Sequence, residues 1–242
     1  RMSFFAVVVI SVGAVAALLR LLPRHIAAER GSIVKEFVAL RDAQVLLALL
    51  TSVLCSASLF CVFTYIAPLL TDVSGFSQAA IAPILLVFGV GLTVGSTLGG
   101  RLGDRHLVPS IFLVMMCTSL VLTAMHWSAA AHAPMVLTLF VWGMLAFSLV
   151  PLLQTLIVHH AAAAPRLAST LNQGAFNLGN AIGAWSGSYL LSERLPLADL
   201  SWASVGFTLS AIGVTALGNL FFARTATVHT SQRCDAGARA AV

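Results

Sequence analysis

A short charged cluster carries the clearest chemistry in this sequence of 242 residues. Residues 99–106 read Gly-Gly-Arg-Leu-Gly-Asp-Arg-His and lie between two long apolar stretches. A carboxylate such as Asp104 can accept hydrogen bonds from a helix N-terminus, or it can pair with the guanidinium of Arg101 or Arg105. On this chemistry alone, the cluster predicts a solvated turn that joins two helices.

Polar side chains inside the apolar stretches are spaced so that they share helix faces. At 100° per residue, Gln173, Asn177 and Asn180 fall within roughly 60° of one another. Carboxamides do not face lipid, so this face must meet neighbouring helices or a watery cavity. For any single residue, a hydrogen bond between helices is the simpler interpretation. Thr51, Ser58 and Tyr65 likewise share a face of the 45–70 stretch, and Gln154 shares a face of the 134–158 stretch with Phe147. Three such faces together predict a solvated central cavity. Its expected lining residues are Thr51, Ser58, Tyr65, Phe147, Gln154, Gln173, Asn177 and Asn180.

The residue patterns of enzymes and metal sites do not occur. No Asp, Glu, Lys or Arg lies in the middle third of an apolar stretch, and the sequence has no G-x-S-x-G motif. The four cysteines form no C-x-x-C pair. His159 and His160 are adjacent, so they point away from each other on a helix. We therefore expect no enzyme activity, no metal site and no cofactor.

The composition is that of a membrane protein. Apolar residues make up 59% of the chain and charged residues 9%, whereas soluble domains average about 45–50% and 25%. These figures exclude an ordinary soluble enzyme, a coiled coil and a disordered protein. The net charge of +5 comes from 13 basic and 8 acidic residues without a basic run. Nucleic acid is therefore not an expected partner.

Seven stretches are long and apolar enough to cross a lipid bilayer as helices. A crossing needs about 20 mostly apolar residues, and a helix satisfies its own backbone hydrogen bonds in lipid. We expect an all-α membrane protein with seven transmembrane helices. The stretches are Met2–Leu22, Val45–Leu70, Ala80–Gly100, Ser110–Trp127, Pro134–Val158, Ser169–Leu191 and Trp202–Ala223.

Basic residues fall unequally on the two sides of these stretches. When residues 23–44 are placed in the cytoplasm, all basic residues except Arg1 and Arg194 lie on that side. This bias follows the positive-inside rule. Within the 23–44 linker, the apolar spacing predicts a short amphipathic helix on the membrane surface. The tail at 224–242 is small and polar, so we expect it to be cytoplasmic and disordered.

Glycines repeat every four residues in two of the stretches. Such stripes let helix backbones approach closely in membranes. The pattern fits static packing and also fits a surface that slides during a conformational change. The expected packing residues are Gly91, Gly95 and Gly99 in one stretch and Gly179, Gly183 and Gly187 in another.

The charged cluster and two further segments resemble the major facilitator superfamily. Gly100, Arg101, Leu102, Gly103, Asp104 and Arg105 match its G-x-L-x-D-R signature in the second-half copy. Residues 64–70 (TYIAPLL) with 74–77 (SGFS) resemble the first span of the second half in arabinose-efflux-permease-like members. Residues 176–185 (FNLGNAIGAW) resemble their penultimate span. Together these segments cover most of residues 45–190.

This resemblance implies a parent with twelve spans. Residues 1–22 would be its sixth span, 23–44 the linker between halves, 45–223 the second six-helix bundle and 224–242 the tail. The N-terminal half would then be a missing partner. The implied protein is an exporter in the bacterial inner membrane that works by alternating access and proton antiport. In it, the six residues of the signature form a conformational latch centred on Asp104 and Arg105.

Other functions stay open at this stage. The exported molecule could be drug-like or a sugar, because the expected cavity offers both aromatic and hydrogen-bonding groups. A seven-helix receptor or sensor is the alternative to a transporter. Such a protein needs an effector surface on the inner side, and the short loops after Arg101 and His159 argue against one.

Overall fold

The computed structural model describes residues 2–21, 42–162 and 164–239. These residues form helices and turns, and none of them lies in a β-strand. The chain divides into two units, Arg1–Ile33 and Val34–Val242. The amphipathic helix expected in the 23–44 linker falls mainly on residues outside the described part.

The first unit contains helix α1, Met2–Leu21, which matches the first expected span. It is 20 residues long, and at about 1.5 Å per residue a helix of this length covers the hydrocarbon thickness of a bilayer. Arg20 lies in its last turn, where a cation interacts favourably with the helix dipole.

Helix α3, Ala43–Phe63, begins at a side-chain cap and ends earlier than expected. The Asp42 carboxylate accepts a hydrogen bond from the Gln44 backbone N–H at 2.9 Å. The expected span reached Leu70, but α3 is followed by a short helix, α4 (Ile66–Pro68), and a π-helical turn, η1 (Leu69–Val73). Pro68 has no N–H and its ring crowds the carbonyl four residues earlier, so the break falls just before it.

Helix α5, Gln78–Ser128, reverses direction at His106, which has non-helical angles (φ −146°, ψ 78°). The Ser110 hydroxyl donates to the Leu102 carbonyl at 3.3 Å, whereas residues eight apart in a straight helix are separated by about 12 Å. We call residues 78–105 the first arm and 107–128 the second arm. Two of the expected spans thus lie in α5, one in each arm. Pro109 is tolerated because it lies in the first turn of the second arm.

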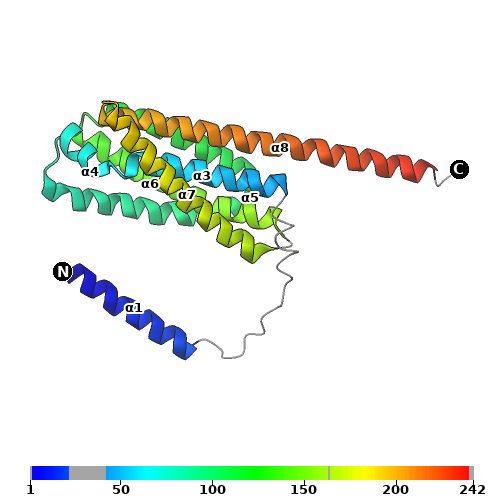
Figure 1. Ribbon diagram of the computed structural model, residues 1–242, viewed down its shortest axis with the longest axis horizontal. Coiled ribbons are helices and arrows are strands. Elements are labelled where there is room, and N and C mark those ends of the chain that lie inside the picture. The colour runs from blue at the N-terminus through cyan, green and yellow to red at the C-terminus, as the bar shows by residue number, and fades with distance from the viewer. Residues whose placement is uncertain (1, 22–41, 163, 240–242) are drawn as a thin grey trace. The chain divides into compact units, whose positions relative to one another are not determined.

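Three long helices complete the second unit: α6 (His132–His160), α7 (Pro165–Ser192) and α8 (Leu200–Arg239), the last preceded by the 3₁₀ turn η2 (Leu197–Asp199). Helix α8 continues past Ala223 to Arg239 (Figure 1), and the disorder expected for the 224–242 tail stays a prediction. This stretch has no proline to end the helix.

Four helices in the described part are long and apolar enough to cross a membrane: Ala43–Phe63, Gln78–Ser128, His132–His160 and Leu197–Leu220. Within the second unit, α3 packs against α7 and α8, and α5 packs against α6 (Figure 1). Large apolar side chains such as Leu86 and Leu137 are 71% and 64% exposed. Such exposure is normal for helix faces that contact lipid tails, which are as apolar as leucine.

Candidate functional site

Glycines bring the first arm of α5 into backbone contact with α6. A Cβ atom placed at Gly91 or Gly95 would overlap backbone atoms of Phe140 or Met144. At Gly99 it would lie 2.9 Å from Cγ of Pro151. Any side chain larger than hydrogen would therefore push these two helices apart.

The second glycine stripe joins α7 to α3 in the same way. A Cβ atom at Gly179 or Gly183 would overlap a backbone carbonyl of α3, and one at Gly187 would lie 2.9 Å from the Cys61 carbonyl oxygen. The overlapped carbonyls belong to Val53 and Ala57. We call the side of α3 that these α7 glycines contact the glycine face of α3.

Two of the expected cavity residues bond across this glycine face. The Ser56 hydroxyl on α3 donates to the Asn180 side-chain carbonyl on α7. The Tyr65 hydroxyl donates to the Ala184 backbone carbonyl at 3.2 Å. Asn180 and Tyr65 are half-buried, so each also has surface beyond this contact.

The other two carboxamides expected to line the cavity from α7, Gln173 and Asn177, are exposed. No hydrogen bond joins their side chains to another residue of the described part. Because an exposed amide is costly in hydrocarbon, this side of α7 needs water or another polypeptide beside it.

A buried carboxamide pair links α6 to α7. The Asn172 side-chain N–H donates to Oε1 of Gln154 at 2.7 Å. Asn172 is completely buried, and its own Oδ1 atom has no partner among the described residues. Gln154 was expected from the sequence, but Asn172 was missed because it precedes Gln173 and faces about 100° away from it. Phe147 lies on α6 two turns before Gln154 and is half-buried.

Thr51 and Ser58, two further residues expected to line a cavity, face α8. Thr51 Oγ1 lies 3.1 Å from Thr215 Oγ1. Ser58 donates to the Ser204 carbonyl at 2.8 Å and lies 2.7 Å from the Thr208 hydroxyl. We call this contact the hydroxyl face of α3. The spacing of Ser204, Thr208 and Thr215 places them within about 40° on one side of α8 and could have indicated the contact.

The charged cluster lies at the end of the first arm of α5, directly before the reversal. Arg101, Asp104 and Arg105 are exposed, and within the described residues Asp104 makes no ion pair with either arginine. Leu102 packs against the buried core, and a Cβ at Gly103 would lie 3.3 Å from a Leu152 methyl group. Gly100 has open space around it. The cluster thus presents three unpaired charges on a firmly packed helix end.

Comparisons with known proteins agree on one family. A sequence model of the Major Facilitator Superfamily matches residues 1–184. The chain is 35% identical over 195 residues to the inner membrane transport protein YdhP of Escherichia coli (strain K12), covering 81% of this chain and 50% of that protein. It is 33% identical over 210 residues to a chloramphenicol resistance protein of Streptomyces lividans, covering 84% and 53%.

A further relative is a probable sugar efflux transporter of Helicobacter pylori (strain J99 / ATCC 700824). The identity is 30% over 164 residues, covering 65% of this chain and 39% of that protein. The chain therefore spans about half the length of the curated relatives it matches, or less.

Proposed function

We propose that this chain, which belongs to the Major Facilitator Superfamily, is part of a transporter that exports a small molecule. It would form the second half of that transporter together with the one helix that precedes this half. Family membership itself points to transport rather than to enzymatic catalysis. In this proposal α1 is the sixth span of a twelve-span protein. The remaining six spans are α3, the two arms of α5, α6, α7 and α8.

The observation that carries this proposal is the exposed carboxamide side of α7. Gln173 and Asn177 are exposed on a helix that lies among apolar neighbours. In a complete transporter the first half would stand opposite this side, and the substrate path would run between the halves. Together with Asn180, Tyr65, Phe147 and Gln154, the two carboxamides would line that path.

Export, rather than uptake, is supported by the relatives. One similar protein is named for chloramphenicol resistance and another for sugar efflux. A drug-like molecule or a sugar is therefore the proposed substrate. Proton antiport would drive its export, although the coupling acids would lie in the first half. The two halves would alternate between inward-facing and outward-facing states, and a ligand shifts that balance only by its differential affinity for them.

The proposed location is the bacterial inner membrane, with the 23–44 linker and the C-terminal tail in the cytoplasm. Basic residues support this orientation, because all but Arg1 and Arg194 then lie on the cytoplasmic side. The charged cluster at residues 100–105 would be on that side as well. There its exposed charges would pair with the first half in one of the two states, which is the role of a latch.

The complete gene in an efflux-deficient host tests the function. We expect it to raise the growth-inhibiting concentration of some drugs, or to lower the accumulation of a labelled sugar. The variant Asn177→Ala should raise the substrate KM about tenfold, since a buried polar contact would be lost. Leu178→Ala changes the neighbouring exposed side chain and is the matched control. If the two variants transport the substrate equally well, the proposal that α7 lines the substrate path is contradicted.

The latch is tested by Asp104→Asn, which keeps the shape of the side chain and removes its charge. We expect slower transport in vesicles, with substrate affinity nearly unchanged, because the residue acts on the conformational change. Arg166→Gln alters an exposed charge at the start of α7 and is the control. Transport at the wild-type rate by the Asp104 variant would contradict the latch.

A further inference from the structure

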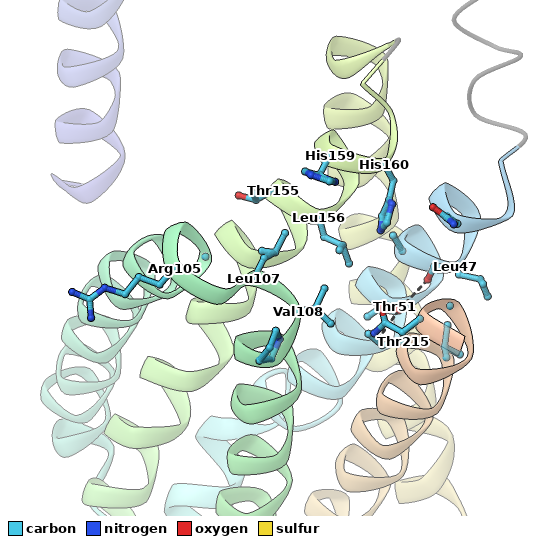
Figure 2. A pocket seen from close by; sticks show the side chains of 17 residues that line it. Leu47, Thr51, Arg105, Leu107, Val108, Thr155, Leu156, His159, His160 and Thr215 are labelled. Atoms are coloured by element: carbon cyan, nitrogen blue, oxygen red, sulfur yellow. Dashed lines mark hydrogen bonds between the residues drawn. The ribbon is translucent and has the colours of Figure 1, made fainter. Parts of the chain in front are cut away.

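One end of the second unit contains a cavity of about 730 Å³ that is open to the surface and lined by α3, the reversal of α5, α6 and α8. Figure 2 shows the Thr51 and Thr215 side chains side by side within the group of residues that line it. It lies where α3 begins and α6 ends. The lining residues named in the argument below are Thr51, Arg105, Leu107, Val108, His159, His160, Thr215 and Gly218.

The walls of this cavity are apolar and its polar groups are cationic or neutral. Leu107 and Val108 belong to the walls, and none of the 17 lining residues is acidic. The imidazoles of His159 and His160 and the stem of Arg105 lie at the end of the helices. In Figure 2 the Arg105 guanidinium extends away from the threonine pair, toward the exposed surface.

The threonine pair can offer a ligand little hydrogen-bond donation. Thr51 lies within hydrogen-bond distance of the Leu47 carbonyl at 3.0 Å, and Thr215 of the Ala211 carbonyl at 2.8 Å. The two hydroxyls also lie 3.1 Å from each other. The two hydroxyls carry one proton each, and three contacts within the protein already compete for these two protons. Neither hydroxyl therefore has a free proton to donate to a ligand. An anionic group would therefore be bound by the histidines and arginine, while an apolar group would fit the walls.

The polar and apolar groups of the cavity fit a ligand that has both an anionic and an apolar part, and the position of the cavity indicates what kind of ligand this is. The cavity lies at the ends of helices that are long and apolar enough to cross a membrane. In a bilayer the ends of such helices lie near the lipid headgroups. The same end carries Arg101 and Arg105, which belong to the basic side of the chain. Asp42 also lies at this end, but its carboxylate is engaged as the cap of α3. Basic pockets between helices on the cytoplasmic side are suited to anionic headgroups.

We propose that this cavity binds an anionic phospholipid of the cytoplasmic leaflet. The phosphate lies between the imidazoles of His159 and His160, whose ring centres are 6.1 Å apart, close enough for one phosphate to reach both although the side chains diverge. Arg105, whose guanidinium extends away in Figure 2, would turn toward this phosphate, and the adjoining methylenes lie against Leu107 and Val108. This inference goes beyond the proposed function. It rests on the membrane orientation proposed above, but it needs neither transport nor a particular substrate, so a failure of transport would leave it standing.

Native mass spectrometry of the full chain, released from nanodiscs that contain phosphatidylglycerol and phosphatidylcholine, measures which lipid remains bound. We expect phosphatidylglycerol to be retained preferentially. Gly218→Leu should weaken its retention about tenfold, because the side chain enters the cavity; the nearest atom to a Cβ there is a Leu47 methyl carbon at 3.7 Å. Gly213→Leu, on the same helix with nothing within 4 Å, is the matched control. Equal retention of the two lipids, or equal effects of the two variants, would overturn the proposal.

A charge variant and a soluble competitor identify the recognised group. The triple change Arg105→Gln, His159→Gln and His160→Gln should weaken phosphatidylglycerol binding about tenfold or more, since charged hydrogen bonds are lost. Arg166→Gln, outside the cavity, should leave binding unchanged. Inorganic phosphate at millimolar concentration should not displace the lipid. Displacement by phosphate would show a soluble-anion site, and full binding by the triple variant would exclude headgroup recognition.

Discussion

The two faces of α3 are joined to their neighbours by different forces. On the glycine face, α7 approaches so closely that a methyl group at Gly179 or Gly183 would overlap α3 carbonyls. On the hydroxyl face, Thr51 and Ser58 bond to hydroxyl and carbonyl groups of α8. The glycine face thus adds close backbone packing to its two hydrogen bonds, whereas the hydroxyl face is joined by hydrogen bonds without such close packing at glycine.

This difference implies unequal tolerance to substitution. Helix association in lipid relies on van der Waals packing. The lipid tails are as apolar as the helix side chains, so the hydrophobic effect does not drive the helices together. A methyl group that separates two backbones loses many small contacts at once. A hydrogen bond between membrane helices contributes only about 0.6 kcal/mol on average, because the separated helices find other partners. We therefore expect the glycine face to be the less tolerant of the two.

The largest expected effect is that of Gly183→Ala. The new methyl group would overlap the Ala57 carbonyl, so the free energy of unfolding should fall by about 1–3 kcal/mol. Unfolding in a graded mixture of denaturing and mild detergents provides the measurement. Gly174→Ala is the control on the same helix, with nothing within 4 Å. It should be neutral or stabilising by up to about 1 kcal/mol, since alanine favours helices. A similar loss from both changes would mean that close approach is not the cause.

The buried pair of α6 and α7 should give an intermediate effect. Asn172→Leu leaves Oε1 of Gln154 without its donor and should cost about 1 kcal/mol of unfolding free energy. Adding Gln154→Leu removes the stranded acceptor too, so the double variant should recover most of that loss. A double variant less stable than the Asn172 variant would show that the pair contributes more than its one hydrogen bond.

The smallest expected effect is on the hydroxyl face. In a double-mutant cycle of Ser58→Ala and Thr208→Val, the coupling free energy should be about 0.6 kcal/mol. Ser210→Ala is the control, because that exposed hydroxyl bonds only within its own helix, to the Gly206 carbonyl at 2.8 Å. A coupling larger than the loss caused by Gly183→Ala would reverse the ranking of the two faces.

Much of the helical architecture could be predicted from residue type and order. Apolar length indicated the long helices, and α6 and α7 each enclose an expected span. The early end of α3 follows from the local chemistry of Pro68, although the sequence prediction continued the span past it. The low apolarity of residues 224–242 by itself does not indicate a helix, whereas α8 continues to Arg239 in the structure.

The candidate site was harder to predict. Periodicity placed Thr51, Ser58 and Tyr65 on one side of the expected 45–70 span. In the structure Thr51 and Ser58 contact α8, and Tyr65, which follows the end of α3, contacts α7. Asn172 was not predicted, because it faces about 100° away from the carboxamide face that Gln173 shares with Asn177 and Asn180. A helical period states which residues share a direction, and it does not state which helix stands there.

By itself, the sequence determined that the chain is helical and built for lipid, because apolar length and backbone hydrogen bonding leave few other solutions in a membrane. It also placed the charges at helix ends. Only the tertiary structure decided which polar groups pair with each other and which stay exposed. Asn172 and Gln173 are neighbours in sequence, yet one is buried against Gln154 and the other is exposed on α7. The reason is that pairing depends on how helices distant in sequence pack together, and no local pattern encodes that arrangement.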